Sequence, residues 1–133
     1  MSTTLYRSIF LIDDDAEDQE IFIEALKEVY PDIQCLCSDD GEEALQQFTT
    51  NNITKPDLFF IDLNMPKLNG KEVLKRLKSI NSLKNIPVIM FSTFFGDTDI
   101  KEFNESGAVH YMIKSTRYSD LCNALKETLS KKW

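Results

Sequence analysis

Short apolar runs alternate with amphipathic segments along the whole chain, and this alternation restricts its fold more than any other feature. Five runs rich in β-branched and aromatic residues have the length of buried strands: 8–12, 33–37, 58–62, 87–92 and 109–114. Five segments that follow them are predicted to be helices: 16–29, 39–48, 70–80, 97–106 and 118–132. Strands that alternate with helices predict βαβ units, and therefore an α/β fold with a parallel sheet covered by helices on both faces.

Local signals predict several helix ends and one buried helix face. Asp40 and Glu43 have the spacing of a capping box, and Gly107 follows a helical segment at the position typical of a C-terminal stop. The first helix is expected to turn one apolar face to the sheet, made of Ile21, Ala25, Leu26 and Val29. These signals agree with the alternation and need no second domain.

Composition limits the classes of function. A chain of 133 residues with 42% hydrophobic residues fits one domain over residues 1–133. Its net charge of −7 disfavours direct binding to nucleic acid, so we expect proteins or cations as partners. No apolar run approaches the length of about 20 residues that spans a bilayer, and no signal peptide is evident, which predicts a cytoplasmic protein without membrane contact. Three cysteines without a CxxC spacing are expected to be reduced and inert: Cys35, Cys37 and Cys122.

Polar side chains stand at the ends of four of the five predicted strands. Asp13, Asp14 and Asp15 follow the first strand, Asp62 ends the third, Ser92 and Thr93 end the fourth, and Lys114 ends the fifth. The carboxyl ends of parallel strands meet at one edge of the sheet, where ligands bind in open α/β folds. We therefore expect these side chains to form one site.

The chemistry of this set predicts a metal and a phosphoryl group. Carboxylates packed a few ångströms apart repel by about 4 kcal/mol per pair at an effective dielectric constant of about 20, so the cluster requires a cation. Oxygen ligands alone favour Mg²⁺ over zinc. Lys114 supplies a positive charge and Ser92 a hydroxyl donor for an incoming anion, with a carboxylate as acceptor.

Taken singly, each of these residues also has an ordinary interpretation. The run of Asp13 to Asp15 has the composition of a helix cap, and Asp62 opens a segment rich in turn residues. Lys114 alone is typical of a solvated lysine, and Tyr111 of a half-buried strand residue. The functional interpretation depends on their joint position at the strand ends.

Four motifs carry a resemblance to a known family: "FLIDDD", "FIDLNMPKLNG", "VIMFST" and "HYMIK". In this order and spacing, over about residues 7–129, the chain resembles the receiver domains of two-component response regulators. The resemblance implies a single doubly wound (βα)5, flavodoxin-like parallel sheet with strand order 2-1-3-4-5. Within the family, it is similar to stand-alone regulators of the chemotaxis type, and segments 62–79 and 82–93 resemble regulators associated with phytochrome-type kinases.

The resemblance also implies the residue roles. Asp62 is the expected phosphoacceptor, with a histidine kinase or phosphotransfer protein as donor. Asp13, Asp14 and Asp62 are the expected Mg²⁺ ligands, together with the backbone carbonyl of Asn64. Ser92 and Tyr111 match the switch residues, and Lys114 the lysine that contacts the phosphate. The face of the fourth helix, fifth strand and fifth helix is the expected contact for a downstream protein, and a candidate for a phosphorylation-dependent homodimer.

Three positions depart from the family pattern. Ser115 follows Lys114 where receivers typically carry a proline in a cis peptide, and a cis bond to a non-proline residue costs about 3 kcal/mol. Thr93 is larger than the usual alanine or glycine, and Phe94 follows it. We expect Thr93 and Phe94 to restrict access of water to the phosphorylated Asp62.

The segment after Lys114 offers one helix and a short tail, with no sequence that predicts an output domain. The expected output is therefore a contact with another protein or onward transfer of phosphate. Two alternatives remain open: a pseudo-receiver that binds partners without being phosphorylated, and a Mg²⁺-dependent phosphatase with an Asp nucleophile. The phosphatase class carries its nucleophile after the first strand in a DxD pattern, which the run of Asp13 to Asp15 also contains.

Overall fold

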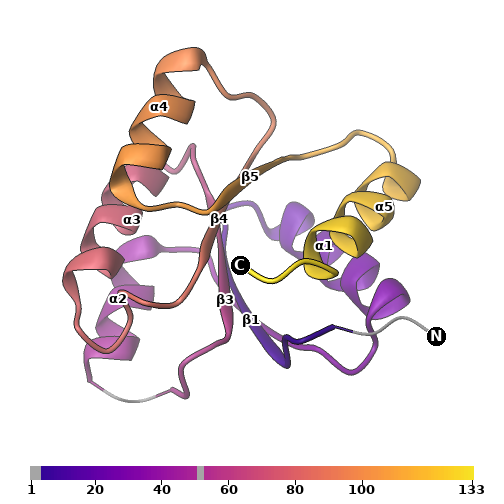
Figure 1. Cartoon of the computed structure of the whole chain (residues 1–133), viewed down its shortest axis with the longest axis horizontal. Helices are drawn as coiled ribbons and strands as arrows, with labels where there is room; N and C mark the ends of the chain where they lie inside the picture. The colour runs from indigo at the N-terminus through magenta and orange to yellow at the C-terminus, as the bar shows by residue number, and fades with distance from the viewer. Residues whose placement is uncertain (1–3, 51–52) are drawn as a thin grey trace.

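The computed structural model describes residues 4–50 and 53–133 and contains one five-stranded parallel sheet between two layers of helices (Figure 1). The strands are β1 (Ser8–Ile12), β2 (Gln34–Ser38), β3 (Leu58–Asp62), β4 (Val88–Ser92) and β5 (His110–Ile113). The helices are α1 (Ala16–Val29), α2 (Gly41–Thr49), α3 (Gly70–Ser79), α4 (Asp97–Ser106) and α5 (Tyr118–Leu129). All ten elements were predicted, with ends that differ by at most a few residues.

The strand order is β2-β1-β3-β4-β5, and every pair is parallel. This confirms the doubly wound, flavodoxin-like sheet. β3 and β4 are buried at every position, whereas β2 and β5 lie at the edges and are partly exposed. The continuous apolar runs of 58–62 and 87–92 therefore reflect central strands that helices cover on both faces.

Two hydrophobic clusters fill the space on either side of the sheet. α1 and α5 cover one face, and α2, α3 and α4 cover the other, as the two groups of helices in Figure 1 show. On the first face the ring of Phe22 packs edge-on against Phe60 and Phe91, at 5.0 and 5.5 Å between ring centroids. On the second, Phe10 and Phe59 pack around Phe48 from α2.

The buried face of α1 differs from the prediction at one position. Ile21 is 37% exposed, whereas its neighbour Phe22 is fully buried. The larger ring fills the space between α1 and the sheet, and the helix is rotated so that Phe22 joins Ala25 and Leu26 in the core.

Helix ends follow the signals in the sequence with one correction. Asp40 caps α2 through its carboxylate, which accepts hydrogen bonds from the amides of Glu42 and Glu43. The reciprocal half of the predicted capping box is wrong, because the Asp40 amide donates to Ser38 Oγ. Gly107 ends α4 with a φ of 96°, a left-handed conformation that glycine adopts without strain.

Among residues 4–50 and 53–133, no helix is both long enough and apolar enough to cross a bilayer.

Candidate functional site

The predicted site residues meet at the carboxyl edge of the sheet. A pocket of about 330 Å³ is lined by Asp14, Asp15, Asp18, Asp62, Asn64, Ser92, Thr93 and Lys114. β1, β3 and β4 bring their terminal side chains to this edge because neighbouring parallel strands end in register there. The polar side chains at the strand ends therefore lie together, as the sequence predicted.

Lys114 is the electrostatic centre of the pocket. Its Nζ lies 2.7 Å from Asp13 Oδ2, 2.9 Å from Asp18 Oδ2 and 3.3 Å from Asp62 Oδ2. The backbone also holds it in place, since the Lys114 amide donates to the Ser92 carbonyl at 2.7 Å. Burial disfavours the charged lysine, but its contacts with Asp13 and Asp18 outweigh this effect and raise its pKa above the ordinary value. Lys114 is therefore a fixed positive charge.

Asp62 is nearly inaccessible at the end of β3, with 4% of its surface exposed. Its Oδ1 accepts a hydrogen bond from the Asn64 amide at 3.2 Å, and its Oδ2 faces Lys114. Burial raises the pKa of the Asp62 carboxyl to about 6, although the charge of Lys114 lowers it. The carboxylate form of Asp62 therefore depends on nearby positive charge.

Asp13 is completely buried and has an oxygen without a well-aligned hydrogen bond. Its Oδ1 accepts from the Asp15 amide at 3.0 Å, but its Oδ2 is balanced only by the charge of Lys114. Burial raises its pKa, and the contact with Lys114 opposes this shift. An acceptor in this state has lone-pair capacity left for a cation.

Asp13, Asp14 and Asp62 provide a donor set that fits a divalent cation. One carboxylate oxygen from each residue lies within 4.8 Å of the others, and Asp14 is exposed to solvent. Together with Asp18, these carboxylates outnumber the one lysine, so the pocket has an excess of negative charge. Oxygen ligands and unbalanced charge are the features that bind Mg²⁺ or Mn²⁺.

A hydrogen bond between Asn64, which follows β3, and Ser92, which ends β4, joins two sides of the acidic pocket. Ser92 is 1% exposed, and its Oγ accepts a hydrogen bond from Asn64 Nδ2 at 3.2 Å. The hydroxyl proton of Ser92 remains available to a second acceptor. Asn64 thus contributes through its amide and its side chain, whereas the role of its backbone carbonyl stays a prediction.

Two of the residues predicted to restrict water or to act as switches, Phe94 and Tyr111, lie outside the acidic pocket. Thr93 lines the pocket, but Phe94 is 71% exposed and does not. Tyr111 on β5 is 39% exposed, and its ring lies 5.3 Å from that of Phe95. The described peptide bonds are all trans, including the one between Lys114 and Ser115.

Sequence reasoning missed Asp18. It lies in the first turn of α1, and its amide donates to the capping Asp15 carboxylate at 3.0 Å. Its spacing gave no signal, because Asp14 and the N-cap Asp15 precede α1, and the four-residue spacing of a helix face does not apply to Asp14. Asp18 is part of the site because it contacts Lys114. The sequence did not reveal this, since acidic residues are common in the first turn of any helix, where they interact with the helix dipole.

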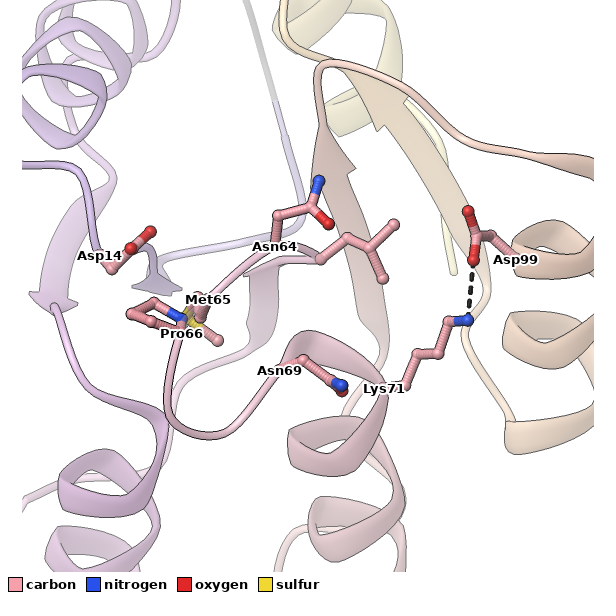
Figure 2. Close-up of a pocket in the computed structure, with 8 residues that line it drawn as sticks. Asp14, Asn64, Met65, Pro66, Asn69, Lys71 and Asp99 are labelled. Atoms are coloured by element: carbon pink, nitrogen blue, oxygen red, sulfur yellow. Dashed lines mark ion pairs between the residues drawn. The ribbon is translucent and has the colours of Figure 1, made fainter.

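A second pocket, of about 560 Å³, adjoins the acidic one and shares Asp14 and Asn64 with it (Figure 2). The segment that follows β3 lies between Asp14 and α4, and contributes Met65, Pro66 and Asn69 to the lining. Across the pocket, Lys71 from α3 pairs with Asp99 from α4.

Comparisons with known proteins identify relatives of this chain. The response regulator Rcp1 of Synechocystis sp. is 33% identical over 117 residues, which cover 85% of this chain and 80% of Rcp1. The chemotaxis protein CheY1 of Helicobacter pylori J99 is 29% identical, over 80% of this chain and 83% of that protein. Other relatives are longer, and the match covers only 34% of a protein-glutamate methylesterase/protein-glutamine glutaminase from Carboxydothermus hydrogenoformans.

Solved structures agree with these relatives. The phosphorylated cyanobacterial phytochrome response regulator RcpA superposes with a TM-score of 0.82 at 35% identity, over 92% of this chain and 91% of RcpA. The Mn²⁺-bound form of Rcp1 gives 0.79 at 32% identity, over 91% and 90% of the two chains. The family model of the response regulator receiver domain matches residues 9–126. The chain therefore belongs to the response regulator receiver domain family, whose members act in two-component signalling.

Proposed function

We propose that this receiver domain accepts a phosphoryl group on Asp62 from the phosphohistidine of a histidine kinase or phosphotransfer protein. The observation that carries this proposal is the position of Asp62. It ends a central strand, its Oδ2 lies 3.3 Å from Lys114 Nζ, and two further carboxylates lie within 4.8 Å. In the transfer, an Asp62 oxygen bonds to phosphorus while the bond from phosphorus to the imidazole nitrogen breaks, and the electron pair leaves with that nitrogen.

The residues around Asp62 can bind and orient the phosphoryl group. Lys114 holds three carboxylates, and its longest contact, to Asp62, is the one that a phosphoryl oxygen can replace. Ser92 has a free hydroxyl proton to donate to a second phosphoryl oxygen. Asp13, Asp14, Asp62 and the Asn64 carbonyl would hold Mg²⁺, which when bound supplies positive charge to the phosphoryl oxygens.

The output of phosphorylation is proposed to be a change in the face formed by α4, β5 and α5. Ser92 stands at the end of β4, and its movement toward the phosphoryl group would change the space beside Tyr111. An inward turn of the exposed Tyr111 ring would then alter the surface offered to a downstream protein or a second copy of this chain. We propose that Thr93, at the pocket, and Phe94, beyond it, limit the approach of water to the acyl phosphate.

The test is intact mass spectrometry after incubation with acetyl phosphate and Mg²⁺. We expect one added phosphoryl group on the native protein, and none on Asp62→Asn or after addition of a chelator. Labelling of Asp62→Asn would show that another residue is the acceptor. If a cognate kinase also fails to label the native protein, the chain acts as a pseudo-receiver. Family membership favours a receiver over the phosphatase alternative, which steady hydrolysis of a phosphate monoester would instead support.

A further inference from the structure

Two connections beside Asp62 are joined near both of their ends by contacts between residues in them or next to them. One is the segment 63–69 between β3 and α3, and the other is the segment 93–96 between β4 and α4. At the near end, Asn64 Nδ2 donates to Ser92 Oγ at 3.2 Å. At the far end, Lys71 Nζ lies 2.7 Å from Asp99 Oδ1, as the dashed line in Figure 2 marks.

Asp99 joins this far-end contact directly to the backbone of the second connection. Its Oδ2 accepts a hydrogen bond from the Gly96 amide at 3.0 Å, while its Oδ1 meets Lys71. Lys71 also contacts Glu102 Oε2, one turn along α4, at 3.0 Å. These contacts raise the pKa of Lys71, and the contacts with Lys71 and Gly96 lower that of Asp99, so both side chains are charged. One lysine therefore holds the start of α4 through two carboxylates.

The start of α3, from which Lys71 extends, packs directly against the backbone of Asp62. The preceding Gly70 donates from its amide to the Leu63 carbonyl at 3.0 Å. A Cβ atom added to Gly70 would lie 2.3 Å from the Asp62 carbonyl oxygen, so the start of α3 packs against the backbone of Asp62 without space between them. The ion pairs of Lys71 thus tie α4 to the backbone that carries Asp62.

The second connection also contacts the candidate switch residue. Phe95 lies between α4 and β5, with its ring 5.5 Å from that of Phe103 and 5.3 Å from that of Tyr111. A shift of segment 93–96 therefore changes the packing around Tyr111. The same segment begins after Ser92, which faces the acidic pocket.

We propose that Lys71 is a positioning residue for the phosphorylation switch: its ion pairs with Asp99 and Glu102 hold segment 93–96 and α4 in the conformation of the unphosphorylated protein. This inference rests on the proposed function and adds the residue that sets how readily the switch moves. Loss of the lysine charge releases the far end of segment 93–96 while the contact of Asn64 with Ser92 remains. The conformation that accepts phosphate is then reached more often.

The experiment compares initial rates of labelling by acetyl phosphate and Mg²⁺, measured by intact mass. Lys71→Met keeps the aliphatic length and removes the charge, and Lys71→Arg keeps the charge. Lys75→Met is the matched control, because Lys75 is exposed one turn along α3 and forms no ion pair with the residues that the structure describes. Asp99→Asn keeps an acceptor for the Gly96 amide and loses the charge that meets Lys71. Urea unfolding establishes that each variant is folded.

We expect Lys71→Met to label about threefold faster than the native protein or more, and Asp99→Asn to change in the same direction. Lys71→Arg and Lys75→Met should label at the native rate. The double variant that combines Lys71→Met with Asp99→Asn should be labelled no faster than Lys71→Met alone, because both changes break the same contact. The NMR resonance of the Tyr111 ring gives a second measurement. In unphosphorylated Lys71→Met it should shift toward the position that it has in the phosphorylated native protein. If Lys71 only stabilised α3, its loss would not cause this shift.

The outcomes separate this inference from the proposed function. If the native protein is labelled but Lys71→Met is labelled at the native rate or more slowly, Lys71 does not restrain the switch and the inference is overturned. An equal acceleration in Lys75→Met would overturn it as well, because the effect would follow from any loss of charge on α3. A native protein that neither acetyl phosphate nor a kinase labels would overturn the proposed function, and the inference with it.

Discussion

Lys114 Nζ lies 2.7 Å from Oδ2 of Asp13, an oxygen that is buried and receives no well-aligned hydrogen bond from the residues that the structure describes. The lysine therefore balances a charge that is otherwise isolated from solvent. The same amino group faces Asp18 and Asp62. Removal of Lys114 would leave buried carboxylates that repel one another.

Lys114→Met should accordingly destabilise the metal-free protein by about 3 kcal/mol, since an unpaired buried charge is strongly unfavourable. Urea unfolding in the presence of a chelator measures this change. Mg²⁺ should restore part of the loss, because a cation among the carboxylates replaces some of the missing charge. Lys67→Met is the control: its side chain is 83% exposed, and its change should stay within about 0.5 kcal/mol. Equal stability of both variants would contradict the role of Lys114.

Asp62 should make the metal-free protein less stable as the pH rises. Burial raises the folded-state pKa of its carboxyl from 3.8 to about 6, so between about pH 4 and 6 the native state binds more protons than the unfolded state. The stability from this group is complete below pH 4 and is lost as the pH passes through 6. Asp62→Asn should therefore stabilise the protein at pH 8, by up to about 3 kcal/mol, and have little effect at pH 4. Urea unfolding with a chelator at both pH values measures this, and a variant less stable than the native protein at pH 8 would refute it.

The sequence predicted the strand ends and their chemistry because those features repeat along the chain. Polar residues stand at the ends of four of the five apolar runs, and only the geometry of a parallel sheet is needed to bring Asp13, Asp62 and Lys114 together. The order of the strands required the resemblance to a family, since alternation alone is compatible with other orders. The contacts that depend on packing between elements were not predictable in the same way.

Asp18 and Ile21 show why. An acid in a first helical turn is favoured by the helix dipole wherever it points, so Asp18 had no signal to distinguish a contact with Lys114. Ile21 and Phe22 are adjacent and both apolar, and only the packing of Phe22 against Phe60 and Phe91 decides which of them faces the sheet. Contacts of this kind depend on the surface of the sheet or helix that packs against the segment, and the sequence of the segment alone does not describe that surface.

Gly70→Ala should damage the site as well as the fold. The added Cβ would lie 2.3 Å from the Asp62 carbonyl oxygen and 2.8 Å from Leu63 Cα, so the backbone that carries Asp62 must shift. We expect a loss of about 2 kcal/mol or more in urea unfolding, and slower labelling by acetyl phosphate. Gly96→Ala is a matched control, because its Cβ would approach no atom closer than 3.5 Å. If the two variants had the same stability and the same rate of labelling, the close approach of Gly70 to the Asp62 backbone would not matter for stability or for phosphorylation.

Mg²⁺ should raise the melting temperature of the native protein through the carboxylates of Asp13, Asp14 and Asp62. Binding to the folded state alone stabilises it by about 2.7 kcal/mol when the free metal concentration is 100 times the dissociation constant. Asp14→Asn keeps the size of an exposed side chain and removes one charged ligand, so most of the shift should disappear, and a chelator should abolish it in the native protein. Asp32→Asn, at an exposed turn outside the pocket, should retain the full shift. Thermal unfolding with and without Mg²⁺ measures all three proteins. A shift of the same size in native protein and Asp14→Asn would mean that the cation binds elsewhere, because a ligand lost from the site must weaken its hold on the metal.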